Sequence, residues 1–127
     1  MSERSAIKLN IAEHHEFWTE ERCFITELIN TPDQPDASLA LARLEPGVTT
    51  QLHALDGLRE TYTIIKGTGL AEINGQFHRL NCNESLIIPA GAAQRITNDG
   101  LEDLEFYCLC TPRFTYNCYV NLESLDT

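Results

Sequence analysis

The segment GVTTQLHALDGLRETYTIIKG (residues 47–67) and the later segment PAGAAQRITN (residues 89–98) contain the strongest indications of how this chain folds. Glycine begins and ends the first segment, and His53 and Glu60 lie between the two glycines. Proline and glycine favour turns, whereas the β-branched and aromatic residues of ETYTII favour a strand. Both segments therefore predict short strands that carry polar side chains at fixed positions.

Short strands separated by turn residues are predicted along most of the chain. Asn74-Gly75, between GLAEI and QFHRL, is typical of a two-residue hairpin. From residue 21 the other predicted strands are CFITELI, SLALARL, TTQLHAL, ESLIIP, AQRIT and LEFYCLC, and PRFTYNCYVNLESLDT is expected to form an extended tail. This pattern indicates an all-β antiparallel sandwich or barrel after a short N-terminal helical or irregular segment.

Length and composition limit the class of protein. The chain has 127 residues, 43% of them hydrophobic, which suits one globular domain over residues 1–127 with a barrel core at about residues 20–115. A formal net charge of −10 argues against nucleic acid and anionic membranes as partners, because phosphate contact needs clustered Lys and Arg. No secretory signal is recognisable, so we expect a cytoplasmic protein whose five cysteines are reduced.

Strand alternation predicts which side chains share a face. Three faces carry the polar candidates: Gln51, His53 and Leu55; Glu60, Tyr62 and Ile64; Gln94, Ile96 and Asn98. If the barrel closes, these faces converge on one interior site. His53 and Glu60 are the candidate catalytic residues, and Gln51, Leu55, Tyr62, Gln94 and Asn98 are the candidate pocket residues.

The two segments resemble the motifs of the cupin superfamily. Its first motif is Gly, five residues, His-x-His, three or four residues, Glu, six residues and Gly, and it fits Gly47, His53, Glu60 and Gly67. Its second motif fits Pro89, Gly91 and Asn98, and Asn83 takes the place of the leading glycine. The resemblance is to small single-domain cupins often called mannose-6-phosphate-isomerase-like. It implies a double-stranded β-helix (jelly-roll) barrel and a homodimer.

The departures from these motifs concern the metal site. Leu55 stands at the second histidine of the first motif and has no donor atom, and Gln94 stands at the histidine of the second. His53, Glu60 and Gln94 would be the ligands if a divalent metal such as Zn, Fe, Mn or Ni binds, but an amide oxygen is a weak donor. The resemblance therefore predicts a degenerate metal site and little or no tightly bound metal.

Three functions remain open from the sequence. The first is a small-molecule-binding cupin of unknown substrate, isomerase-like or lyase-like, in which His53 and Glu60 transfer protons. The second is a metal-dependent dioxygenase or sugar-phosphate isomerase that uses His53, Glu60 and Gln94. The third is a dimeric binding module without catalysis.

Overall fold

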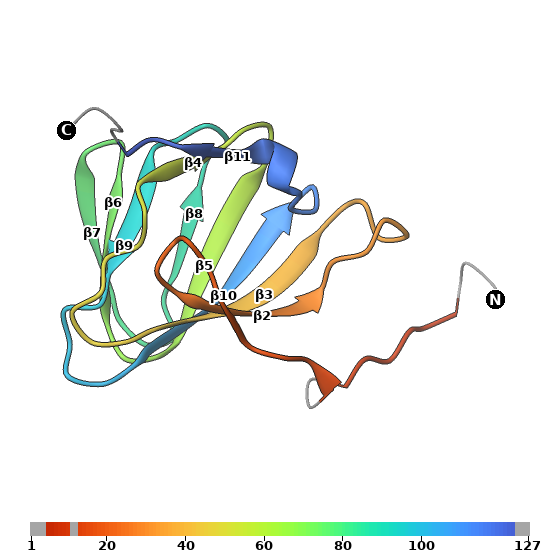
Figure 1. Cartoon of the computed structure of the whole chain (residues 1–127), viewed down its shortest axis with the longest axis horizontal. Helices are drawn as coiled ribbons and strands as arrows, with labels where there is room; N and C mark the ends of the chain where they lie inside the picture. The colour runs from red at the N-terminus through yellow and green to blue at the C-terminus, as the bar shows by residue number, and fades with distance from the viewer. Residues whose placement is uncertain (1–4, 11–12, 124–127) are drawn as a thin grey trace.

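The computed structural model describes residues 5–10 and 13–123 and shows an almost entirely β protein (Figure 1). The described part of the chain forms strands with the following bounds: β1 Phe17–Trp18, β2 Phe24–Ile29, β3 Ser38–Leu44, β4 His53–Leu55, β5 Arg59–Lys66, β6 Gly69–Ile73, β7 Gln76–Leu80, β8 Ser85–Ile88, β9 Gln94–Thr97, β10 Leu104–Thr111 and β11 Tyr119–Asn121. A short 3₁₀ helix, Tyr116–Cys118, directly precedes β11.

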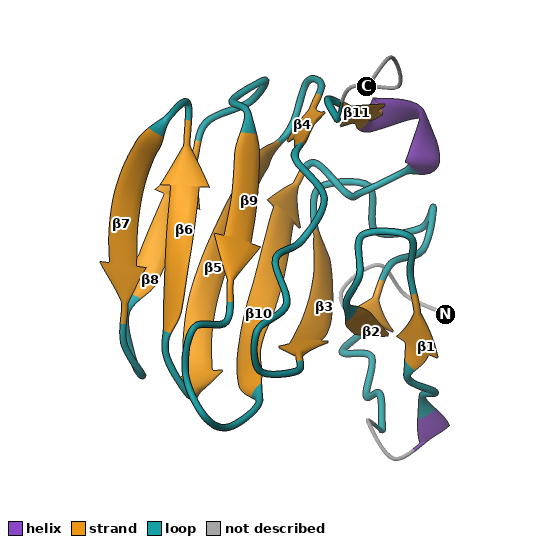
Figure 2. Ribbon diagram, turned by 60° about the vertical axis from the view of Figure 1, so that its left-hand side comes forward, coloured by secondary structure: helices purple, strands orange, loops and turns teal. Residues whose placement is uncertain are grey.

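The strands make two antiparallel sheets that face each other as a jelly-roll barrel. One sheet has the order β1-β2-β3-β10-β5-β8, and the other has the order β11-β4-β9-β6-β7. Figure 2 shows β7, β6, β9 and β4 in front of β8, β5, β10 and β3. The all-β prediction and the jelly-roll class are thus confirmed.

Alternation along each strand explains the core between the sheets. In β10 every second residue is buried, and its inward side chains include Leu104, Phe106 and Cys108. Strand β5 buries Glu60, Tyr62 and Ile64 in the same manner, so that one carboxyl group is carried into a largely apolar interior. Burial of the apolar surface stabilises the barrel, whereas burial of the carboxyl group must be offset by hydrogen bonds.

Several segments differ from the predicted elements. The pattern of TTQLHAL predicts one strand, but only Thr49 bridges to Thr97 before β4 begins at His53. The predicted tail is not simply extended, because β11 pairs with β4 and supplies hydrogen bonds to an otherwise open edge. At the N-terminus, residues 5–10 and 14–16 are irregular, and residues 11–12 of the predicted helical segment lie outside the described residues.

The Asn74-Gly75 hairpin forms as predicted. Both residues have positive φ angles, 50° and 83°, which is the conformation of a type I′ turn. The Asn74 side chain accepts a hydrogen bond from the backbone N–H of Ala93 at 2.9 Å. No helix in the described ranges has the length and apolar character needed to span a bilayer.

The glycine that ends the first motif is required by a close approach between two turns. Gly67 has φ +79°, and a Cβ atom added there would lie 2.7 Å from the backbone oxygen of Asp103. Gly57 has the same φ of +79°, but an added Cβ would meet no atom within 4 Å. Comparing substitutions at the two glycines therefore distinguishes the free-energy cost of the backbone conformation from that of the steric clash.

We expect Gly57→Ala to lower the free energy of unfolding by about 1–2 kcal/mol, because a residue with a side chain is strained at positive φ. Gly67→Ala should cost about 1–3 kcal/mol more, because the backbone of Asp103 must also move. Urea unfolding of both variants, followed by circular dichroism, measures the difference. Equal losses would contradict the close-approach explanation.

Candidate functional site

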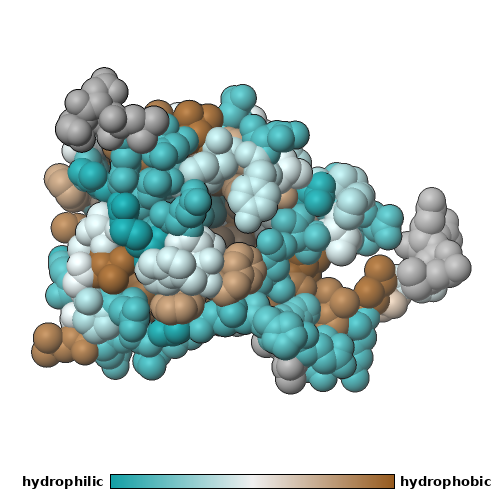
Figure 3. Space-filling model, in the orientation of Figure 1, coloured by the Kyte–Doolittle hydropathy of each residue, from teal (hydrophilic) through white to brown (hydrophobic). Residues whose placement is uncertain are grey.

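A cavity of about 480 Å³ opens at one end of the barrel. Buried side chains of Tyr62, Phe106 and Ala42 lie at its deep end, and the more exposed Trp18 and Tyr116 lie at its rim. The space-filling view shows this face of the molecule hollowed near its centre (Figure 3). Strands β1, β2, β3, β5 and β10 line the cavity together with segments before β2 and after β10.

Glu60 is the buried carboxyl group of this cavity. Its Oε1 accepts a hydrogen bond of 2.7 Å from the Gln94 amide, which also donates to the Tyr62 hydroxyl oxygen at 2.9 Å. The Cys110 thiol lies 3.7 Å from the other oxygen, Oε2. Burial raises the pKa of Glu60, and the nearby His53 and the Gln94 hydrogen bond oppose that rise. Glu60 can therefore hold a proton at a pH where an exposed carboxyl group has lost it.

His53 lies behind the wall of the cavity with only 2% of its surface exposed. Its Nδ1 is 2.8 Å from the backbone oxygen of Gln51, and because a carbonyl only accepts, Nδ1 carries the proton. The ring stacks on Tyr119 with centroids 4.9 Å apart. In the neutral ring Nε2 is consequently the free base, and it lies 3.6 Å from Oε1 of Glu21.

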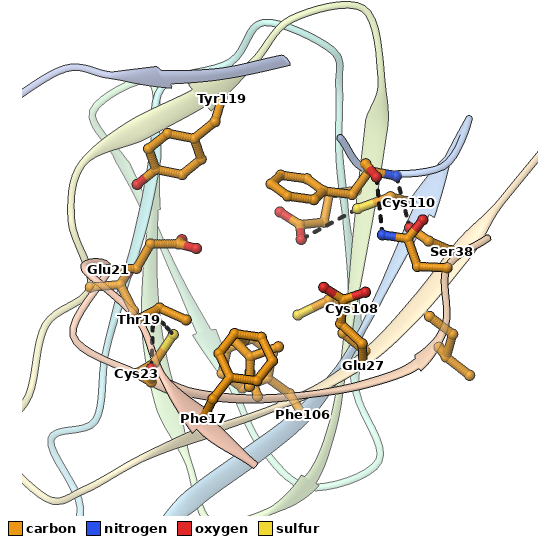
Figure 4. Close-up of a pocket in the computed structure, with 18 of the residues that line it drawn as sticks. Phe17, Thr19, Glu21, Cys23, Glu27, Ser38, Phe106, Cys108, Cys110 and Tyr119 are labelled. Atoms are coloured by element: carbon orange, nitrogen blue, oxygen red, sulfur yellow. Dashed lines mark hydrogen bonds between the residues drawn. The ribbon is translucent and has the colours of Figure 1, made fainter. Parts of the chain in front are cut away.

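Glu21 lines the cavity without belonging to any of the sequence motifs. It follows β1 in a turn that returns the chain to β2, and Figure 4 shows its carboxyl group directed into the cavity. Burial raises the pKa of Glu21, while the charge of His53 acts in the opposite direction. No sequence pattern indicates this role, because Glu21 lies in no motif and on no strand face.

The remaining predicted pocket residues have different positions. Gln51 lines the cavity and accepts a hydrogen bond from the Tyr119 hydroxyl, and Tyr62 also lines it. Leu55 does not line the cavity but packs in a small cluster with Leu58, Cys110 and Cys118. Asn98 is fully buried away from the cavity and stabilises the turn before β10, where its amide donates to the backbone oxygens of Leu44 and Glu102.

The sequence matches the family described as "Cupin domain" over residues 40–110. The chain therefore belongs to the cupin family. No curated protein matches it.

Similar solved structures are also cupin-fold proteins. Streptomyces Pac13, described as a nucleoside dehydratase, has a TM-score of 0.78 and 15% identity, with 94% of this chain and 92% of that chain covered. KdgF from Halomonas has a TM-score of 0.76 and 16% identity, with 87% and 96% covered. A predicted oxalate decarboxylase from Thermotoga maritima has a TM-score of 0.73 and 21% identity, with 84% and 99% covered. At these identities the likeness shows a shared fold.

Divalent metals are common in this family, but the donor set of this chain does not fit one. Within residues 5–10 and 13–123, no three His, Cys, Asp or Glu side chains are arranged to hold a metal ion. Gln94 directs its amide nitrogen, which has no lone pair to donate, at Glu60. Leu55 supplies no donor atom. A catalytic site normally keeps three strong ligands, and here His53 and Glu60 alone remain from the family set.

Restoring the two missing imidazoles should create a metal site. The double variant Leu55→His, Gln94→His places them beside His53 and Glu60, and we expect it to retain about one equivalent of Zn²⁺ through dialysis. Elemental analysis of the dialysed protein is the measurement. The same double variant with Glu60→Ala is the control and should lose most of the ion. Equal retention by the wild-type protein would contradict the poor fit of its donor set.

The pKa shift of Glu60 predicts a pH effect on stability. Because the folded protein binds this proton more tightly than the unfolded chain, folding stability should fall as the pH rises from the unfolded pKa through the folded pKa. Glu60→Gln cannot titrate, so its midpoint temperature should decline less between pH 4 and 8. Thermal unfolding across this range measures the slope.

Asp99 provides a control of opposite sign. Its pKa is lowered by the hydrogen bond and charge of Arg79, so its contribution to stability is lost as the pH falls. Asp99→Asn should therefore flatten the acid side of the profile. A slope unchanged by Glu60→Gln would show that Glu60 is not desolvated in the folded protein.

Proposed function

We propose that this protein is a small-molecule enzyme of the lyase or isomerase type that uses general acid–base catalysis without a tightly bound metal. The observation that carries the proposal is the convergence of two carboxyl groups, Glu21 and Glu60, on one cavity, with the His53 imidazole behind Glu21. Perturbed carboxyl groups in a cleft are typical of proton-transfer sites.

The geometry supports different roles for the two carboxyl groups. Glu60, whose pKa is raised by burial, is suited to remain protonated and act as the acid. Glu21 touches the cavity and is suited to act as the base, with Nε2 of His53 able to share the proton that it takes. In a lyase reaction, Glu21 would remove a proton from a carbon next to a carbonyl group, and the C–H electrons would form the double bond. Glu60 would give its proton to the departing hydroxyl, which leaves as water.

The charge of the cavity favours an uncharged ligand. Four glutamates contribute to its lining, namely Glu20, Glu21, Glu27 and Glu60, and no Lys or Arg occurs among the described residues that line it. A phosphate or carboxylate ligand would meet like charge there without a compensating cation. This weighs against the sugar-phosphate isomerase alternative, and the poor donor set weighs against a metal-dependent dioxygenase.

The rim of the cavity favours a ligand with a planar ring. Exposed Phe17 and Trp18 line one part of it, and Phe114 and Tyr116 line another, with the last two rings 5.7 Å apart. Aromatic side chains stack on planar ligands, while the polar groups below suit hydroxyl groups. Pac13 is described as a nucleoside dehydratase and was studied with uridine. Uridine is an example of such a ligand, because it is uncharged, carries hydroxyl groups and has a planar base.

The size of the cavity bears on the non-catalytic alternative. A structural module needs no ligand space, whereas this cavity has about 480 Å³ and polar groups at its wall, within the range of small-molecule sites. A ligand-binding function is therefore favoured over a purely structural one. The homodimer stays a prediction.

Binding can be followed through Trp18, the single tryptophan of the chain, which lines the cavity and is 55% exposed. We expect uridine to change its fluorescence saturably, and uridine 5′-phosphate to bind at least about tenfold more weakly because its charge meets the glutamates. The double variant His53→Ala, Glu60→Ala should lose uridine binding while remaining folded by circular dichroism.

His78→Ala is the matched control, because His78 lies on β7 outside the cavity lining. Equal or tighter binding of uridine 5′-phosphate would reject the uncharged ligand class. Unchanged uridine binding in the folded double variant would reject the site itself. A complete lack of saturable uridine binding to the wild-type protein would reject a planar nucleoside-like ligand.

A further inference from the structure

Glu21 and His53 are distant in the sequence. A third residue, Glu123, contacts the chain segments that carry them. The Glu123 carboxylate forms a two-pronged ion pair with the guanidinium of Arg22, the residue after Glu21. The same carboxylate accepts a hydrogen bond of 3.1 Å from the backbone N–H of Leu52, the residue before His53. One side chain thus contacts the immediate chain neighbours of both members of the acid–base pair.

Backbone hydrogen bonds complete this connection. The N–H of Gln51 donates to the backbone oxygen of Glu21 at 3.1 Å, and the N–H of Leu122 donates to the oxygen of Leu52 at 2.9 Å. The Arg22 side chain also donates from Nε to the backbone oxygen of Thr49 at 3.0 Å. The turn that carries Glu21, the approach to β4 and the segment after β11 are therefore joined at one point.

The conformation of the Glu21 turn shows why it needs such a support. Arg22 has φ 70°, a left-handed conformation that is unfavourable for a residue with a side chain. Its N–H donates to the oxygen of Thr19 at 3.1 Å, which closes the turn. Without the pairing of its guanidinium, Arg22 loses a contact that holds this backbone, and Glu21 loses support for its position beside His53.

We propose that Glu123 is a positioning residue that holds Glu21 against His53. Glu123 is absent from the lining of the cavity, so it acts through Arg22 and Leu52 and does not touch the ligand. That this positioning serves catalysis rests on the proposed function. That Glu123 holds Glu21 near His53 rests on the contacts alone. An ordinary surface ion pair would add little to global stability and would leave a distant carboxyl group unaffected.

The test is amide hydrogen exchange in the full chain, measured by NMR. The N–H of Arg22 donates to the backbone oxygen of Thr19 within the turn, and the N–H of Gln51 donates to the backbone oxygen of Glu21. In Glu123→Ala the turn should open, and both N–H groups should exchange about tenfold faster or more because these hydrogen bonds are broken more often. Glu123→Gln should have a smaller effect, because its amide oxygen can still accept from Leu52 but no longer offers Arg22 a charge.

Asp99→Ala is the matched control, since Asp99 forms the same kind of two-pronged pair with Arg79 on the surface. It should leave the exchange of the Arg22 and Gln51 N–H groups unchanged. If Glu123→Ala does not fold, Glu123→Gln and Arg22→Gln carry the test, and both should speed the exchange of the Gln51 N–H. Unchanged exchange at Arg22 and Gln51 in a folded Glu123 variant would overturn the proposal. Because this readout needs no ligand, failed uridine binding would reject the nucleoside-like ligand of the proposed function and leave the positioning role intact.

Discussion

The hydrogen bond between Glu60 and Gln94 is the interaction on which the interior of this barrel depends. A carboxyl group in an apolar interior is costly unless it is neutral or well paired. Here Gln94 donates to it at 2.7 Å from the opposite sheet, and the same amide reaches Tyr62. One side chain therefore satisfies the buried acid and fixes the orientation of the groups around it.

This arrangement also explains how the site of this chain differs from the metal site of the cupin motif. Where the cupin motif has a histidine, Gln94 presents N–H groups to Glu60, so the carboxyl group is engaged by a donor and not by a cation. Burial raises the pKa of Glu60, and the charge of His53 and the Gln94 hydrogen bond oppose that rise only in part. Gln94 in place of the motif's histidine therefore removes a strong metal ligand and gives Glu60 a neutral hydrogen-bond donor.

The two ends of the described chain supply much of what makes the cavity a site. The segment before β2 brings Glu21 to His53, and the segment after β10 brings Tyr119, which stacks on the imidazole. The family match covers residues 40–110, so both contributions lie outside it. Within one fold, function is set by such grafted groups, and in the function that we propose they are a carboxyl group and an aromatic wall.

Most strands, the Asn74-Gly75 turn and the faces that carry Glu60 and Tyr62 could be predicted from the sequence, because residue preference and strand alternation are local properties. The spacing of the motifs was also enough to relate Gln94 to Glu60. The folded chain was needed to show that Glu21, and not Glu60, faces Nε2 of His53, and that Asn98 stabilises a turn. These contacts depend on how segments distant in the sequence pack against the barrel, which no local pattern records.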